Sequence, residues 1–238
     1  MKSKIEWCDY TINPVKGLCP MVCPYCYARR MYKRFKWNPN IRADWQETGK
    51  LPNKPSRIFV GSTMELFGEW IKPEWMEEIF KMVKRYPQHT FIFLTKQPQN
   101  LIKWSPFPDN CWVGVSWIGD DESRPLRHIV DIKAPVKFIS FEPLLEFCHW
   151  WTSDLLQQSF IKAGINWVII GAQTPYSKKT APRIEWVKEI VDAADKAKIP
   201  VFLKNNLIKL WGDDLFYPEW AMNKTGFHFR QELPERGK

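Results

Sequence analysis

The amino-acid sequence predicts an α/β fold, a partial (β/α) barrel of about six parallel strands with helices on the outside. Short apolar runs rich in β-branched and aromatic residues alternate with amphipathic segments along the chain. Strands that are apolar on both faces are typical of parallel sheets covered by helices. An open doubly wound sheet usually carries a glycine-rich phosphate turn, and neither GxGxxG nor GxxxxGK(S/T) occurs. The barrel is therefore the favoured architecture.

The predicted strands begin near the amino terminus, where residues 4–12 can form the first one. The apolar runs that follow span residues 57–61, 90–95, 112–117, 137–141, 167–171 and 200–204. In β/α barrels the active-site residues gather at the carboxyl ends of the strands. The residues that end these runs are therefore the first places to look for polar chemistry.

Helical periodicity fills the intervals between several strands. Residues 73–85 place five apolar side chains on one face, and a proline suits the first turn. These side chains are Trp75, Met76, Ile79, Phe80 and Val83. We expect three further helices: one capped by Ser123, one over residues 153–163, capped by Ser153 or Asp154 and stopped by Gly164, and one over 184–197.

The composition fits one ordinary domain of 238 residues, of which 45% are hydrophobic. We expect residues 1–206 to form the barrel and residues 207–238 to form a C-terminal covering segment of the same domain. No apolar run reaches the roughly 18 residues that a membrane-spanning helix needs, and the first nine residues lack a signal-peptide hydrophobic stretch. The sequence therefore predicts a soluble, cytoplasmic protein without a membrane partner.

Three of the six cysteines crowd into the segment CPMVCPYC, as Cys19, Cys23 and Cys26. In a cytoplasmic chain this crowding indicates metal or cluster ligation rather than disulfides. Prolines after the first two cysteines favour an extended loop. Three thiolates at this spacing can bind three corners of an iron–sulfur cubane and leave one iron without a protein ligand. A structural zinc site is the alternative, with Cys8 or a histidine as fourth ligand.

The segment CPMVCPYC resembles the CxxxCxxC motif of the radical S-adenosylmethionine (SAM) superfamily, including the aromatic Tyr25 before the third cysteine. The later segments resemble an uncharacterised phage- and prokaryote-associated branch of that superfamily. These segments are FVGSTMELFGEW, FIFLTKQPQNL, WVGVSW, FISFEPLL, WVIIGAQ and VFLKNN, in this order. The resemblance covers the chain from Ile5 to about Asn206.

The resemblance implies a radical SAM-like partial barrel that binds a four-iron four-sulfur (4Fe-4S) cluster and SAM. Cys19, Cys23 and Cys26 would bind the cluster, and its unique iron would chelate SAM. An electron from an external flavodoxin- or ferredoxin-like donor would cleave SAM to a 5′-deoxyadenosyl radical, which abstracts hydrogen from the substrate. The cofactors would supply the difficult chemistry, and the protein would orient them.

The resemblance also implies roles for residues that end the predicted strands. The cofactor-binding set is Tyr25, Gly61, Ser62, Thr63, Glu65, Ser116, Gly171, Gln173 and Lys204, and the catalytic candidate is Glu142. Residues 61–65 would contact the methionine amino group, and Ser116 would contact the ribose. Two positions depart from the family pattern, because Ser62 replaces a glycine and Gln173 replaces a glutamate.

The net charge of +9 favours an anionic substrate, such as a nucleic acid or a nucleotide. A basic, aromatic-rich helix over residues 27–37 and a basic loop over residues 176–183 point the same way. The helix by itself fits better with a solvated face whose aromatic side chains turn inward, and a peptide or small-metabolite substrate stays open. The alternative function is a non-enzymatic, metal-stabilised (zinc or Fe-S) nucleic-acid-binding phage accessory protein.

Overall fold

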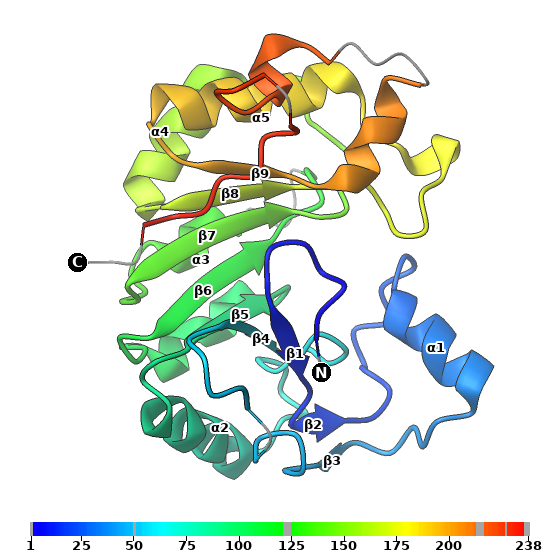
Figure 1. Ribbon diagram of the computed structural model, residues 1–238, viewed down its shortest axis with the longest axis vertical. Coiled ribbons are helices and arrows are strands. Elements are labelled where there is room, and N and C mark those ends of the chain that lie inside the picture. Colours follow the sequence, from blue (N-terminus) through cyan, green and yellow to red (C-terminus); the bar gives the residue numbers. More distant parts are fainter. Residues whose placement is uncertain (1, 50, 121–124, 213–216, 227, 236–238) are drawn as a thin grey trace. The chain divides into compact units, whose positions relative to one another are not determined.

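The computed structural model describes residues 2–49, 51–120, 125–212, 217–226 and 228–235 (Figure 1). Its contacts divide the chain into two compact units, Met1–Gly114 with Ile132–Pro135, and Val115–Asp131 with Val136–Lys238. In the described residues, seven strands form parallel sheet structure, and helices accompany the strands of both units. The predicted α/β class with parallel strands is therefore confirmed.

The first unit is built on parallel strands in the order β1, β4, β5 and β6. Their bounds are β1 Tyr10–Ile12, β4 Arg57–Val60, β5 Thr90–Thr95 and β6 Cys111–Ser116. The boundary between the units falls inside β6. The unit also contains an antiparallel pair, β2 (Val15–Lys16) with β3 (Arg42–Ala43), and helices α1 (Tyr27–Phe35), α2 (Pro73–Arg85) and η1 (Pro98–Trp104).

The helix α2 follows the predicted amphipathic pattern. Its proline stands in the first turn, and its buried residues are Met76, Ile79, Met82 and Val83. The half-buried Phe80 contacts Phe93 of β5 at a ring-centroid distance of 5.7 Å. Burying such a face stabilises the unit by roughly 1.5–3 kcal/mol for each large apolar side chain.

The second unit contains the parallel strands β7 (Val136–Phe141), β8 (Trp167–Ile170) and β9 (Val201–Leu203). Its α-helices are α3 (Leu126–Ile129), α4 (Ser153–Ala163) and α5 (Ile184–Lys196), and its 3-10 helices are η2 (Lys178–Thr180), η3 (Asn205–Leu210) and η4 (Glu219–Ala221). Figure 1 shows α4 and α5 side by side along these strands. All thirteen residues of the three strands are at most partly exposed, as expected for strands covered by other elements.

Two element ends differ from the expectation, and a third expected end lies outside the described residues. The first strand is shorter than predicted, because the backbone turns where the N–H of Cys8 donates to the carbonyl of Ile5, and regular pairing starts only at Tyr10. The N-cap of α4 is Thr152, whose hydroxyl accepts from the N–H of Leu155, so the expected cap was one or two residues too late. The expected cap Ser123 lies outside the described residues.

The C-terminal segment after Asn206 pairs with β9. The N–H of Leu203 donates to the carbonyl of Arg230 at 2.7 Å, and the N–H of Glu232 donates to the carbonyl of Val201 at 2.9 Å. The indole N–H of Trp167 in β8 also donates to the carbonyl of Glu232. These bonds satisfy backbone groups that the edge strand β9 would otherwise leave open.

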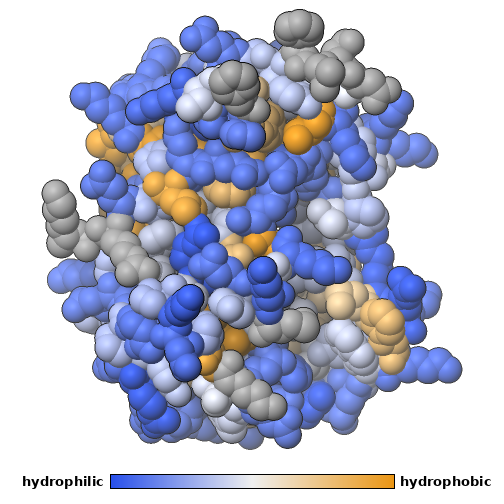
Figure 2. Space-filling model, in the orientation of Figure 1, coloured by the Kyte–Doolittle hydropathy of each residue, from blue (hydrophilic) through white to orange (hydrophobic). Residues whose placement is uncertain are grey.

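In the described part of the chain, no helix combines the length and the hydrophobicity needed to cross a membrane. Hydrophilic residues cover most of the face drawn in Figure 2. Several of the tryptophans serve packing, since Trp7, Trp117 and Trp167 are almost fully buried.

Candidate cysteine-cluster site

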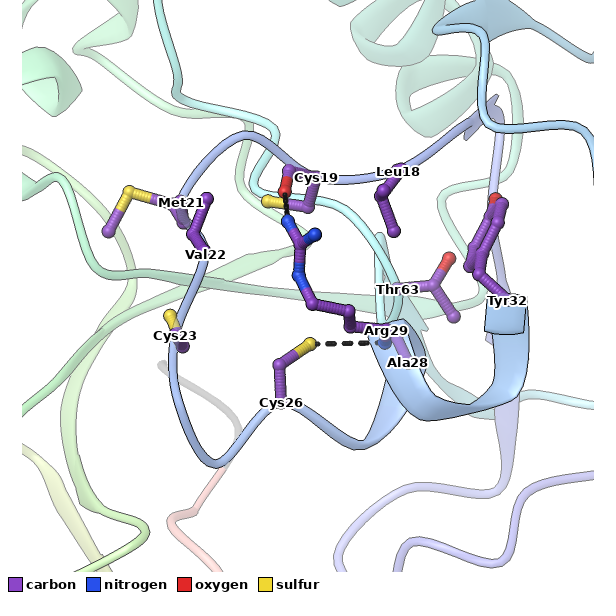
Figure 3. Close-up of a pocket in the computed structure, with 10 residues that line it drawn as sticks. All are labelled: Leu18, Cys19, Met21, Val22, Cys23, Cys26, Ala28, Arg29, Tyr32 and Thr63. Carbon is purple, nitrogen blue, oxygen red and sulfur yellow. Dashed lines mark hydrogen bonds between the residues drawn. The ribbon is translucent and has the colours of Figure 1, made fainter. Parts of the chain in front are cut away.

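The three clustered cysteines line one small pocket of the first unit (Figure 3). The other lining residues are Leu18, Met21, Val22, Ala28, Arg29, Tyr32 and Thr63. The segment 17–26 between β2 and α1 has no regular secondary structure, as the two Cys-Pro steps predict. The three cysteines that the sequence singled out therefore share one pocket.

Cys26 is the N-cap of α1. Its sulfur accepts a hydrogen bond from the N–H of Arg29 at a donor–acceptor distance of 3.4 Å. The first turn of a helix presents unpaired N–H groups and a partial positive charge, which would favour a negatively charged cluster at this position. The helix itself is fixed by Tyr32, whose hydroxyl accepts from the N–H of Gly17 at 2.7 Å.

Arg29 links the first and third cysteines. Its backbone N–H is bonded to Cys26, and its guanidinium donates to the carbonyl oxygen of Cys19 at 2.8 Å. Figure 3 shows this side chain running between the two cysteines. One residue therefore fixes both ends of the loop that carries the thiols.

Burial raises the pKa of the Cys19 thiol above its ordinary value, and the backbone N–H groups of Glu65 and Met21 offset part of this shift. The same N–H groups would stabilise a thiolate once a metal replaced the proton. Such N–H···S bonds around cluster sulfurs are one of the means by which proteins adjust cluster potentials.

The segment after β4 lies beside the cysteine loop. Its Thr63 lines the pocket, and the hydroxyl of Tyr27, the first residue of α1, donates to the carbonyl of Ser62 at 2.6 Å. Gly61 begins the turn with φ +81°, a conformation that favours glycine. The structure therefore brings the predicted residues Gly61, Ser62 and Thr63 to the cysteine loop.

Asn13, which follows β1, organises this segment and was not singled out from the sequence. Its side-chain oxygen accepts from the Ser62 hydroxyl at 3.2 Å and from both the N–H and the hydroxyl of Thr63 at 3.0 Å. The sequence signal that could have identified Asn13 is its place as a polar residue directly after the first predicted strand. Only the parallel pairing of β1 with β4 shows which loop it reaches.

Glu65 is buried, and its carboxylate accepts three hydrogen bonds from the protein. The donors are the N–H of Phe67 at 3.1 Å, the hydroxyl of Thr95 at 2.7 Å and the N–H of Lys96 at 2.7 Å. The side chain thus fastens the segment after β4 to the end of β5. A buried carboxylate is tolerated here because its charge is hydrogen-bonded.

The end of β5 also contacts the cysteine loop. The ammonium group of Lys96 lies over the ring of Tyr25 at 5.9 Å from the centroid, within cation–π range. The side-chain amide of Gln97 donates to the sulfur of Met21 at 3.0 Å. Tyr25 therefore contacts an element that borders the loop, and Lys96 adds a positive charge there.

Among the described residues, no three His, Cys, Asp or Glu side chains are grouped so that they could bind one metal ion. A cubane makes a different demand, because each of its thiolates binds a separate iron. Cys8, the fourth ligand considered for zinc, does not line the cysteine pocket. Its thiol donates to the Ser3 hydroxyl, and burial raises its pKa to about 11.

The second unit has its own polar group at the strand ends. Glu142, which follows β7, forms an ion pair with Lys204, which follows β9. Gly171, which follows β8, lies against this pair, because a Cβ atom there would meet the Lys204 Cδ at 2.9 Å and the Glu142 Cγ at 3.3 Å. The structure therefore brings these three predicted residues together.

The remaining predicted positions of the second unit are Ser116 and Gln173. Ser116 is the last residue of β6 and is buried, while Gln173 is half-buried. Between Gly171 and Gln173, the backbone N–H and carbonyl of Ala172 are both bonded to the side chain of Asn206, at 3.1 and 2.7 Å. Asn206 is a second residue that the sequence did not single out, and it fixes the backbone beside the ion pair.

Comparison with known proteins places the chain in a family without an assigned activity. A search of curated proteins gave no match. The family model described as "Protein of unknown function (DUF5131)" matches residues 2–213, which include every candidate site residue described above. This protein therefore belongs to the DUF5131 family.

Proposed function

We propose that this protein is a radical SAM enzyme that acts on an anionic substrate, a nucleic acid or a nucleotide. The observation that carries the proposal is the pocket shared by Cys19, Cys23 and Cys26, together with the CxxxCxxC spacing of these residues. A 4Fe-4S cluster bound there with SAM would supply reductive cleavage of SAM to a 5′-deoxyadenosyl radical, which abstracts hydrogen from the substrate.

The donor set fits such a cluster. Three thiols on one irregular loop provide the soft ligands that iron–sulfur clusters require. The N–H of Arg29 and the N-terminus of α1 offset negative charge at Cys26, and two backbone N–H groups do so at Cys19. The described pocket has no fourth thiol, carboxylate or imidazole in its lining, so a cluster held there would keep one iron open to SAM.

The residues around the pocket would orient SAM rather than react with it. The carboxylate of Glu65 has three protein donors, so its role in the proposal is to hold the backbone of residues 61–67 beside the cluster. Thr63, which lines the pocket, is the side chain of this segment proposed to face SAM. Tyr27 holds the carbonyl of Ser62, and Asn13 holds the N–H of Thr63.

In the second unit, Glu142 and Lys204 are the groups proposed to contact the substrate. Lys204 is buried and Glu142 is half-buried, with 10% and 22% of their side chains accessible, so the carboxylate side of the pair is the more exposed. Proposed recognition of the anion relies on the exposed Lys178 and Lys179 of η2 and on the net charge of +9.

Anaerobic purification followed by iron, sulfide and zinc analysis tests the cluster. We expect about four irons and four sulfides per chain. Addition of dithionite and SAM should then yield 5′-deoxyadenosine, detected by chromatography. The variant Cys23→Ala should form none, whereas Cys148→Ser, which changes a cysteine outside the pocket, should match the wild type. Stoichiometric zinc without iron would reject the enzyme and favour the metal-stabilised nucleic-acid-binding protein.

A further inference from the structure

The chain around the cysteine loop is strongly cationic. Residues 11–43 contain seven lysines and arginines and no aspartate or glutamate. Lys16 is neutralised by Asp44 and Glu47 at 2.9 and 3.1 Å. Most of the others belong to α1 or directly follow it. Charge of one sign gathered on one element produces a local field that evenly mixed charges do not.

The exposed end of α1 combines this charge with apolar side chains. Lys33, Arg34 and Lys36 are exposed, as are Phe35 and Trp37, at 51% and 43%. We call these five residues the α1 surface. In the part of the chain that the structure describes, no carboxylate lies within ion-pair distance of its lysines or arginine. A large exposed aromatic pair inside a cationic rim is typical of a protein interaction site.

The aromatic side chains of the α1 surface are packed against one another. Phe35 and Trp37 stack at 5.5 Å with 23° between their planes, and the Tyr32 ring meets Trp37 edge-on at 5.3 Å. The Arg34 guanidinium lies over the Phe35 ring at 5.3 Å. Such rings lose little freedom when a partner protein binds, which favours affinity. Nucleobase stacking needs an open ring face, and the Phe35–Trp37 stack and the Arg34 guanidinium each take part of that face.

The α1 surface lies at the carboxyl end of the helix that Cys26 caps at its amino end, and Cys26 is one of the proposed cluster ligands. The helix is coupled to that loop through the Arg29 bonds to Cys26 and Cys19. At 1.5 Å per residue, the last turn of this helix lies roughly 10–14 Å along the axis from Cys26, and this length would separate a protein bound to the α1 surface from the proposed cluster ligand. Close approach is needed for electron transfer, because tunnelling rates fall steeply with distance, whereas nucleic-acid binding alone requires no closeness to a redox centre.

We propose that the α1 surface is the docking site of a small acidic one-electron carrier protein. This inference rests on the proposed function, since reductive SAM cleavage needs an electron from outside the chain. One electron leaves the reduced flavin or cluster of the carrier, which is oxidised by one electron. The same electron reduces the protein's cluster by one electron, and no atom is transferred.

The test compares two charge-reversed variants of the full-length, cluster-loaded protein. Lys33→Glu with Arg34→Glu changes the last turn of α1. Lys84→Glu with Arg85→Glu makes the same change in charge at the equally exposed last turn of α2, which contributes nothing to the cysteine pocket. Because reversal can fray a helix end, the neutral pair Lys33→Gln with Arg34→Gln serves as a milder variant.

The probe is photoreduced flavodoxin, a carrier with an acidic surface, and the readout is the initial rate of cluster reduction at low salt. We expect the α1 reversal to slow this rate about tenfold and the α2 reversal to leave it within about twofold, with the difference shrinking at high salt. The neutral pair should give an intermediate rate. Direct reduction by dithionite, which needs no docking, should be the same in all variants.

Three results would overturn the inference. Equal slowing by the two reversals would assign the effect to net charge alone. Unchanged flavodoxin rates together with lost binding of a single-stranded DNA oligonucleotide would make the α1 surface a nucleic-acid site. Slower reduction by dithionite would mean that the substitutions damage the cluster rather than the docking. The iron and sulfide content of the wild type is measured before the kinetic experiments. A wild type without iron and sulfide would reject the proposed function itself.

Discussion

The Thr95 hydroxyl donates a 2.7 Å hydrogen bond to the buried carboxylate of Glu65, and this contact joins the end of β5 to the segment that borders the cysteine pocket. The hydroxyl also accepts from the N–H of Gln97 at 2.8 Å, so its hydrogen is directed at Glu65. Residues 30 positions apart in the chain thereby share one network. Two backbone N–H groups complete it around the carboxylate.

We predict that Glu65→Gln destabilises the protein by about 1–3 kcal/mol, because an amide has one oxygen where three donors converge. The free energy of unfolding from urea titration measures the change. Glu69→Gln, at an exposed position four residues later, is the matched control and should stay within about 0.5 kcal/mol of the wild type. Equal effects of the two substitutions would show that the Glu65 network contributes nothing specific.

Arg29 should control how firmly the loop retains iron. We expect Arg29→Gln to lose the bond to the Cys19 carbonyl and to release iron to a chelator several-fold faster than the wild type, in line with other residues that position metal ligands. Arg29→Lys should fall between the two, because it keeps the charge but not the forked geometry. Lys33→Gln, on the exposed side of α1, is the control. Identical release rates in all four proteins would contradict the role given to Arg29.

The buried Cys19 thiol should titrate above its ordinary range in the metal-free protein. We predict that in a variant with every other cysteine replaced by serine, the alkylation rate of Cys19 rises at a higher pH in the folded protein than in urea. Burial favours the neutral thiol in the fold, so the folded pKa is the higher one. Iron binding to the folded chain should correspondingly strengthen as pH rises, since the proton must leave first. A folded profile at or below the urea profile would exclude this effect of burial.

Asp9 and Arg57 form an ion pair between the residue before β1 and the first residue of β4, at 2.9 Å. The Arg57 side chain lowers the pKa of Asp9, so the pair contributes stability above the ordinary aspartate pKa and loses it as pH falls through the folded pKa. Asp9 is 41% exposed, so we expect Asp9→Asn to cost no more than about 1 kcal/mol at neutral pH.

The cost of Asp9→Asn should disappear in acid, where the wild-type carboxyl is also neutral. Urea titrations of both proteins at several pH values measure this trend. Asp109→Asn, at an exposed position outside the regular strands and helices, is the matched control for the substitution itself. A constant difference between wild type and Asp9→Asn at all pH values would mean that the effect comes from packing and not from charge.

Strand and helix positions were predictable because the signals are local. The run 90–95 is the strand β5 at the residues predicted, and the periodicity of 73–85 is the helix α2. The predicted ends of elements were wrong where neighbouring residues compete for the same structural role. At α4, both Thr152 and Ser153 have capping hydroxyls, and only the backbone geometry, extended at Thr152, selects the first.

The sequence by itself determined that three thiols stand on one irregular loop ahead of a basic helix, because proline, cysteine spacing and helical periodicity act over a few residues. Only the tertiary structure decided what surrounds that loop. Asn13, Ser62 and Thr63 meet because β1 and β4 pair in parallel, although about fifty positions separate them in the chain. The donors that satisfy Glu65 are likewise set by packing. Contacts between residues so far apart in the chain depend on the register of the whole sheet. No local sequence pattern encodes that register.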